Sequence, residues 1–237
     1  MANSIAVKGI TKRYGSQLAV NDITFTVSSG EIVGFIGPNG AGKSTTMKII
    51  TGTIPPDQGE VKIGERAVGE HLKSIRKMIG YLPENNPLYL EMYIREYLEY
   101  VAGLYQIKGK LRKERIARVI EMTGLGPELH KKIGSLSKGY RQRVGLSQAL
   151  IHDPEILILD EPTTGLDPNQ LMEIRKLISD IGSQKTILLS THILQEVEAI
   201  CDRVIIIDQG SIMADDNSES LKQKGRGTSR TIHVELD

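Results

Sequence analysis

Residues 32–45 have the sequence IVGFIGPNGAGKST, and this stretch decides the fold. Its first five residues are continuously apolar, which is typical of a strand buried on both faces of a parallel sheet. Gly37–Ser44 fit the pattern G-x-x-x-x-G-K-[ST], in which glycines let backbone N–H groups close around phosphate oxygens. The residues Thr46–Thr51 predict a helix, whose N-terminus favours anions. The stretch therefore predicts a P-loop that binds nucleotide phosphates.

Residues of this loop have expected roles at the phosphates. We expect Lys43 to bridge the β- and γ-phosphates and Ser44 to ligate Mg²⁺. A Gly-rich turn with an incidental lysine is the alternative, although a chance match in a chain of this length is about a one-in-a-hundred event. The residues expected to bind the nucleotide here are Gly37, Pro38, Asn39, Gly40, Ala41, Gly42, Lys43, Ser44 and Thr45.

A second apolar run supplies the acids that a P-loop needs for hydrolysis. Ile156–Leu159 lead directly into Asp160 and Glu161, at the sheet edge where α/β proteins bind ligands. We expect Asp160 to hold Mg²⁺ in the Walker B role and Glu161 to polarise the attacking water. His192 ends another apolar run, so it is expected to contact the γ-phosphate at the same edge. A buried strand with acids at a solvated end is the alternative, and it fits poorly beside a P-loop.

Composition sets limits on the class of protein. The chain has 237 residues, 30 basic and 29 acidic side chains, and a formal net charge of +1. This balance argues against a dedicated nucleic-acid binder, and no nucleic-acid partner is expected. The single Cys201 excludes an internal disulfide framework and suits a reducing compartment. No apolar run approaches the roughly 20 residues of a membrane span, and the N-terminus lacks a signal-peptide pattern.

Alternation of strand and helix patterns predicts an α/β fold with a mostly parallel sheet. Residues 4–36 are expected to be mostly strand, and residues 87–148 form a helical insert in which Ile94, Leu98, Val101 and Leu104 or Tyr105 make an apolar stripe. Residues 215–237 are expected to be a polar linker or tail, with an isolated strand pattern at 231–236. The remaining strand patterns are Ile156–Leu159, Thr186–Leu189 and Val204–Ile207, with helices at Leu171–Ile181 and Ile193–Ile200.

The order of the motifs resembles the nucleotide-binding domain of ABC ATPases. The segment Leu136–Gln142, LSKGYRQ, stands about twenty residues before Asp160 and completes the set with the P-loop and His192. The resemblance covers about residues 1–214 and implies a P-loop NTPase core with a mostly parallel sheet, an N-terminal antiparallel part and a helical subdomain at about 87–148. It also implies a head-to-tail dimer that sandwiches two ATP molecules.

The same resemblance assigns further residues. It implies that Ser137 and Gly139 contact the γ-phosphate of the partner's nucleotide and that Tyr14 stacks on adenine. It places Asp167 in the D-loop, at the dimer interface, and makes His192 the H-loop switch. The chain departs from the family at Lys138 and Tyr140, and at Glu84, where the Q-loop usually has glutamine. We expect Glu84 to be a ligand of Mg²⁺ as well.

These departures resemble the ABC-2 exporter branch, and the segments 81–89 and 165–170 look closest to the ATP-binding subunit of the gliding-motility exporter. Five of the eight tyrosines fall between Tyr89 and Tyr105, and Tyr89, Tyr93 and Tyr97 share a face if the segment is helical. The family docks a coupling helix of its membrane subunit nearby. Docking to that subunit and packing of the helical insert both stay open for these rings.

The predicted function is Mg-dependent ATP hydrolysis that powers a separate integral-membrane permease. The protein is expected to be cytoplasmic, to lie on the inner face of the cell membrane through that permease, and to form a homodimer on ATP binding. Two alternatives remain: a soluble ABC ATPase of DNA repair or translation, and a module that signals by ATP-driven dimerisation. The sequence does not indicate the cargo.

Overall fold

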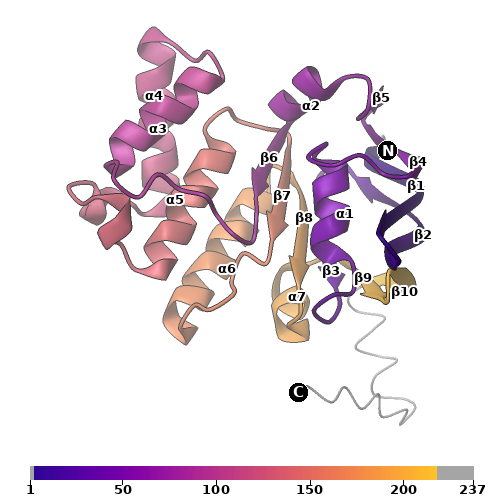
Figure 1. Ribbon diagram of the computed structural model, residues 1–237. Helices are drawn as coiled ribbons and strands as arrows, with labels where there is room; N and C mark the ends of the chain where they lie inside the picture. The colour runs from indigo at the N-terminus through magenta and orange to yellow at the C-terminus, as the bar shows by residue number, and fades with distance from the viewer. Residues whose placement is uncertain (1–2, 218–237) are drawn as a thin grey trace.

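The computed structural model describes residues 3–217 and is built around a six-stranded sheet (Figure 1). The strand order in this sheet is β10-β9-β3-β8-β7-β6, and only the pairing of β10 with β9 is antiparallel. This confirms the predicted mostly parallel sheet. The strands are β3 (Ile32–Ile36), β6 (Ile79–Leu82), β7 (Ile156–Asp160), β8 (Thr186–Thr191), β9 (Arg203–Asp208) and β10 (Ser211–Asn217).

A second, antiparallel sheet has the order β2-β1-β4-β5. Its strands are β1 (Asn3–Tyr14), β2 (Gln17–Ser28), β4 (Gln58–Ile63) and β5 (Arg66–Ala67). Alternate residues of β2, including Ile23, Phe25 and Val27, are buried as their period predicts. Phe25 meets Phe35 of β3 with ring centroids 5.4 Å apart, so the two sheets share one apolar core with helix α1 (Lys43–Ile50).

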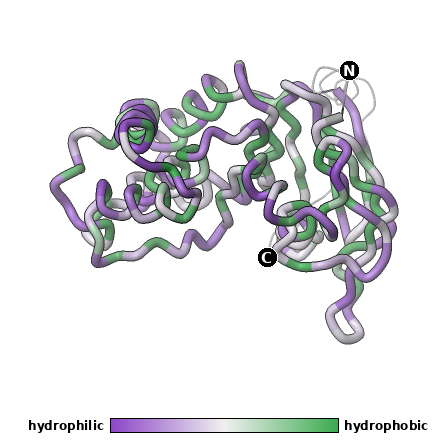
Figure 2. The backbone as a smooth tube through the Cα atoms, turned by 90° about the horizontal axis from the view of Figure 1, so that it is seen from above, coloured by the Kyte–Doolittle hydropathy of each residue, from purple (hydrophilic) through white to green (hydrophobic). Residues whose placement is uncertain are grey.

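The helical insert lies beside the sheets in both views (Figures 1 and 2). It consists of α3 (Ile94–Leu104), α4 (Gly109–Thr123) and α5 (Lys138–Leu150), with two short 3₁₀ turns, η1 (Gly126–Glu128) and η2 (Ile133–Ser135). Three further helices complete the described residues: α2 (Leu72–Met78), α6 (Pro168–Gly182) and α7 (Leu194–Ile200).

Strand β7 separates two cores because its side chains alternate between the faces of the sheet. Leu157 and Leu159 join the core that contains the helical insert, α6 and α7. Ile156 and Ile158 join the core of α1 and the antiparallel sheet. All of these side chains are fully buried, so the sequence of β7 is apolar throughout rather than alternating.

Several boundaries differ from the sequence prediction. Helix α1 begins at Lys43, three residues earlier than predicted, and Leu104 is 65% exposed, so it does not belong to the buried stripe of α3. Strand β10 continues to Asn217, three residues into the segment 215–237 expected to be a linker or tail. The strand pattern at 231–236 lies outside the described residues. Helix α2 and the strands β4, β5, β6 and β10 were not predicted.

Across residues 3–217, every helix is too short or too polar to span a bilayer. The sequence shows the same, since none of its apolar runs is long enough to cross a membrane.

His152 connects the end of α5 to the strand β6. Its ring stacks on Tyr105 with centroids 3.9 Å apart, and its Nε2 lies 3.0 Å from the carbonyl oxygen of Ile79. An N–H at Nε2 donates to that carbonyl in the neutral ring. Burial lowers the pKa of His152 to about 4, so the histidine stays neutral in the native state.

We expect this histidine to make the stability of the fold depend on pH. The unfolded chain protonates His152 near its ordinary pKa of 6.5, whereas the folded chain does so only near 4. The unfolded state therefore binds more protons in this range, and stability is lost as the pH falls, by about 2 kcal/mol between roughly pH 7.5 and 5. Urea unfolding across this range should show a shallower pH dependence for His152→Gln than for the wild type. His71→Gln, at an exposed histidine, is the control, and equal slopes in the wild type and His152→Gln would contradict the prediction.

Candidate functional site

The glycine loop joins β3 to α1 and holds its backbone against neighbouring strands. A Cβ on Gly37 would lie 2.2 Å from the carbonyl oxygen of Ile207, and one on Gly42 would lie 2.5 Å from that of Ala19. Gly42 also has a φ of 106°, in the left-handed region that favours glycine. The first turn of α1 has no acidic residue, and among the described residues no side chain caps it. Its N–H groups and dipole are therefore directed at the space above the loop.

Lys43 places its ammonium group at the centre of the loop. Its Nζ donates to the carbonyl oxygens of Gly37, at 2.6 Å, and Pro38, at 3.2 Å. The same Nζ lies 3.2 Å from Oε1 of Glu161, and both side chains are buried, at 5% and 6% exposure. A buried cation and a buried carboxylate thus balance each other beside the loop.

Asp160 lies at the end of β7 and receives two hydroxyl groups. Ser44 Oγ donates to Asp160 Oδ1 at 3.1 Å, and Ser190 Oγ donates to the same atom at 2.6 Å. Burial raises the pKa of Asp160, and these two hydrogen bonds oppose that shift. The carboxylate and the Ser44 hydroxyl are oxygen donors of the kind that Mg²⁺ prefers.

Glu161 turns away from Asp160 because its backbone is in the left-handed region, with a φ of 49°. Its N–H donates to Ser190 Oγ at 3.0 Å, which fixes this turn at the end of β7. Its Oε2 accepts a hydrogen bond from Thr164 Oγ1 at 3.0 Å and lies 2.9 Å from His192 Nδ1. Glu161 is therefore held by Lys43, Thr164 and His192 at once.

A cavity of about 380 Å³ extends from Lys43, Ser44 and Glu161 to Tyr14. Tyr14 is 48% exposed, and Lys12 Nζ lies 5.9 Å from its ring centroid. Asp57 accepts from Lys12 Nζ at 2.8 Å and from the N–H of Arg13 at 2.7 Å, so it fixes the strand end that carries the tyrosine. The cavity is lined by Tyr14, Gln17, Ala19, Pro38, Asn39, Gly40, Gly42, Lys43, Ser44, Thr45, Glu84 and Glu161.

Seven of the predicted residues do not line this cavity: Gly37, Ala41, Asp160, His192, Ser137, Gly139 and Asp167. Ser137 caps α5 by accepting a hydrogen bond from the N–H of Tyr140 at 3.3 Å. Asp167 caps α6 through the N–H groups of residues 169 and 170. Gly139 packs on Gln170 of α6, where a Cβ would come within 2.6 Å of the side chain. Within one chain, the segment Leu136–Gln142 therefore lies against α6 and not at the P-loop.

Two hydroxyl residues of the site were not predicted from the sequence. Ser190 connects Asp160 to the turn at Glu161, and Thr164 holds the Glu161 carboxylate. The only signal for Ser190 was its position at the end of an apolar run beside His192. Its pairing with Asp160 across β7 and β8 was not visible without the register.

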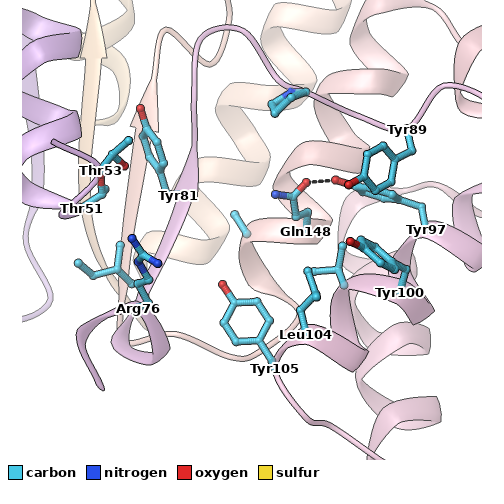
Figure 3. Close-up of a pocket in the computed structure, with 14 residues that line it drawn as sticks. Thr51, Thr53, Arg76, Tyr81, Tyr89, Tyr97, Tyr100, Leu104, Tyr105 and Gln148 are labelled. Carbon is cyan, nitrogen blue, oxygen red and sulfur yellow. Dashed lines mark hydrogen bonds between the residues drawn. The ribbon is translucent and has the colours of Figure 1, made fainter. Parts of the chain in front are cut away.

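Five tyrosines, at positions 81, 89, 97, 100 and 105, line a second cavity of about 390 Å³ between the helical insert and β6 (Figure 3). The Tyr89 ring lies 5.9 Å from that of Tyr97 and 5.4 Å from that of Tyr100. Tyr97 is buried and donates to Gln148 of α5, and burial raises its pKa to about 12. A shared face of Tyr89, Tyr93 and Tyr97 was expected only if the segment were helical, and this condition is not met because α3 begins after Tyr93.

The comparisons with known proteins agree on one family. The family model described as "ABC transporter" matches residues 20–164. The chain is 39% identical over 228 residues to the bacitracin transport ATP-binding protein BcrA of Bacillus licheniformis, covering 95% of this chain and 74% of that protein. It is 36% identical over 225 residues to the Nod factor export ATP-binding protein I of Rhizobium sp. (strain N33), covering 94% and 74%.

A solved structure is similar over nearly the same length. It is a dimeric structure of a post-hydrolysis state of the ATP-binding cassette MJ0796 bound to ADP and Pi. The TM-score is 0.82 at 27% identity, covering 90% of this chain and 98% of that one. This similarity confirms the predicted α/β fold with its antiparallel N-terminal sheet. The relatives give no support to the gliding-motility resemblance.

Proposed function

The chain belongs to the ABC transporter family, and we propose that it hydrolyses ATP at the site around Glu161 to power an exporter permease. The observation that carries this proposal is the position of the Glu161 carboxylate. It lies between the P-loop cation Lys43, at 3.2 Å, and His192, at 2.9 Å. A carboxylate placed there can orient and deprotonate a water beside the γ-phosphate.

The P-loop residues bind and orient the phosphates in this proposal. The N–H groups of the loop and of α1 receive the phosphate oxygens, and Lys43 exchanges its Glu161 partner for the γ-phosphate. Glu161 Oε1 is then free to accept a proton, while His192 and Thr164 keep the carboxylate in place through Oε2. Glu161 therefore becomes available as a base only when ATP has replaced it as the partner of Lys43.

Ser44, Asp160 and Glu84 are the residues that we assign to Mg²⁺. The oxygen donors of Ser44 and Asp160 are already within 3.1 Å of each other, and Glu84 lines the same cavity. Mg²⁺ bound there would neutralise charge that develops on the phosphates. A cation also offsets the cost of burying Asp160, whose pKa is raised by burial.

A second copy of the chain completes the site in our proposal. Ser137 and Gly139 do not line their own P-loop cavity, and Ser137 is exposed at the start of α5. A helix N-terminus of this kind can receive the γ-phosphate of ATP bound to the partner subunit. The dimeric structure of the similar cassette, MJ0796, supports a homodimer. We propose that Asp167 lies near the interface of this dimer.

The tyrosine-lined cavity is the surface that we propose for the permease. Tyr89 and Tyr100 are half-exposed there and combine apolar rings with polar tips, while Arg76 supplies a cation on the opposite wall (Figure 3). Tyr81 of this cavity lies in β6, three residues before Glu84 of the nucleotide cavity. Docking there would hold the chain on the cytoplasmic face of the membrane. The gliding-motility role is not part of this proposal.

Replacing Tyr14 tests the adenine position. We expect Tyr14→Ala to weaken ATP binding by about 1–3 kcal/mol, since it removes the stacking surface for the base. Tyr14→Phe keeps the ring and should bind nearly as well as the wild type. Fluorescence titration with a labelled ATP measures both affinities. Tyr93→Ala, at a tyrosine of equal exposure outside the cavity, serves as the control, and an unchanged affinity in Tyr14→Ala would refute the assignment.

Replacing Glu161 tests the catalytic assignment. Glu161→Gln keeps the side-chain shape and removes the base, so we expect ATP turnover to fall by about 10²–10⁴-fold. ATP binding should persist, and light scattering should detect an ATP-dependent dimer. Glu155→Gln, at the other end of the same β7 segment, controls for the loss of a carboxylate. Near wild-type turnover in Glu161→Gln would sink the proposed mechanism.

The same Glu161→Gln variant tests the membrane partner. As bait with Mg-ATP in detergent-solubilised membranes of the source cell, it should recover a polytopic membrane protein. We expect Tyr89→Glu or Tyr100→Glu in the same bait to reduce this recovery, because each places a charge in the tyrosine-lined cavity. Recovery of ribosomal or nucleic-acid-bound proteins instead would favour a soluble ATPase and contradict the exporter proposal.

A further inference from the structure

A buried glutamate stands behind the switch histidine. Glu196, in α7, is 1% exposed, and its Oε2 accepts a hydrogen bond from Thr191 Oγ1 at 2.7 Å. Acidic side chains are almost never this deeply buried without a strong partner, because desolvation disfavours the charge. The mechanism given above does not use this group.

The ion pair of this glutamate is loose. Arg175 Nη2 of α6 lies 3.9 Å from Glu196 Oε1, beyond hydrogen-bond distance. Within residues 3–217, Glu196 Oε1 and Arg175 Nε are both buried without a hydrogen-bond partner. Arg175 is 22% exposed, and an ion pair of this length that solvent reaches contributes little to stability, so stability alone does not account for the pair.

Thr191 connects the glutamate to the active site. Its hydroxyl accepts from the N–H of Ile193 at 3.1 Å, so it holds the backbone on the far side of His192. Its carbonyl oxygen accepts from the N–H of Gly37, the first residue of the P-loop, at 3.4 Å. The conformation of Thr191 therefore sets both the direction of His192 and its distance from the phosphate loop.

Arg175 connects Glu196 to the helix that packs against the segment Leu136–Gln142. It lies on α6, the helix that Asp167 caps and that packs on Gly139 through Gln170. A shift of α6 changes the distance from Arg175 to Glu196. Because the pair is loose, its two atoms have room to approach within hydrogen-bond distance.

We propose that Glu196 is a positioning residue that aims His192 at Glu161 through Thr191, and that Arg175 adjusts it when α6 moves. This inference rests on the proposed function, since it assumes that Glu161 and His192 act in hydrolysis. It gives a route by which a movement of α6 changes the orientation of His192 inside one chain. The alternative is that the Thr191–Glu196 bond only stabilises the start of α7.

The test compares turnover with stability in single-hydroxyl variants. Thr191→Val removes the hydroxyl and keeps the shape, and we expect kcat for ATP to fall about tenfold with KM changed less than about twofold. Thr191→Ser keeps the hydroxyl and should restore most of kcat. Thr123→Val is the matched control, since Thr123 is a buried threonine whose hydroxyl also bonds a side chain, at 2.8 Å from Ser147 Oγ. It should lower Tm to a similar degree and leave kcat unchanged.

The glutamate and the arginine are tested in combination. Glu196→Gln keeps an acceptor for Thr191 but loses the charge that Arg175 senses, so its kcat should match that of Arg175→Met. Because both changes break one route, the double variant should be no worse than either single variant. Fully additive losses would overturn the proposed route, as would a kcat loss in Thr191→Val that Thr191→Ser does not restore.

The outcomes separate this inference from the proposed function. Wild-type kcat in Thr191→Val, with Glu161→Gln inactive, would overturn only the positioning role of Glu196. Full activity in Glu161→Gln would overturn the proposed mechanism itself. An equal kcat loss in Thr123→Val would show that the effect is general destabilisation and would overturn the inference.

Discussion

The parallel register of β3, β7 and β8 is the constraint on which the site depends. Ile36 pairs with Thr191, and Asp160 pairs with Ser190, so three strand ends meet at one edge of the sheet. A predicted functional segment lies at the end of each strand: the P-loop after β3, Asp160 with Glu161 at the end of β7, and His192 after β8. A slip of one residue in β7 would turn Asp160 to the opposite face and remove it from Ser44. Both faces of these strands are buried, which makes such a slip costly.

Close backbone approach couples the two halves of the molecule to this edge. A Cβ on Gly80 of β6 would lie 2.2 Å from the carbonyl oxygen of Ala149 in α5, so strand and helix are in direct backbone contact. His152 adds the stacked ring and the contact with Ile79 beside it. The segment after β6 passes from the nucleotide cavity to the tyrosine-lined cavity within a few residues. A displacement of α5 therefore changes the positions of residues that line both cavities. This suits a subunit that couples ATP binding to a partner protein.

Charge is concentrated in the interior at the places where function needs it. Lys43 and Glu161 form a buried ion pair, and the buried Glu196 lies beside Arg175, which is 22% exposed. Neither is a compact hydrogen-bonded pair of the kind that offsets desolvation well. We propose that the first pair exchanges partners when a phosphate binds and that the second tightens when α6 moves. The apolar cores carry the stability of the fold and leave these pairs free to change.

The sequence by itself determined the motifs, the parallel sheet and the helical insert, because continuous apolar runs, glycine spacing and helical periodicity are local properties. It did not reveal β4, β5, α2 and β6, which are short and carry little periodic signal, nor the cluster of Tyr89 with Tyr100, which forms across a helix start. Only the tertiary structure decided which polar groups meet. The bonds from Ser190 to Asp160 and from Thr191 to Glu196 depend on strand register and helix packing between residues that local patterns treat separately. A site of this kind is specified by sequence one strand at a time and assembled only when the sheet brings the strand ends together.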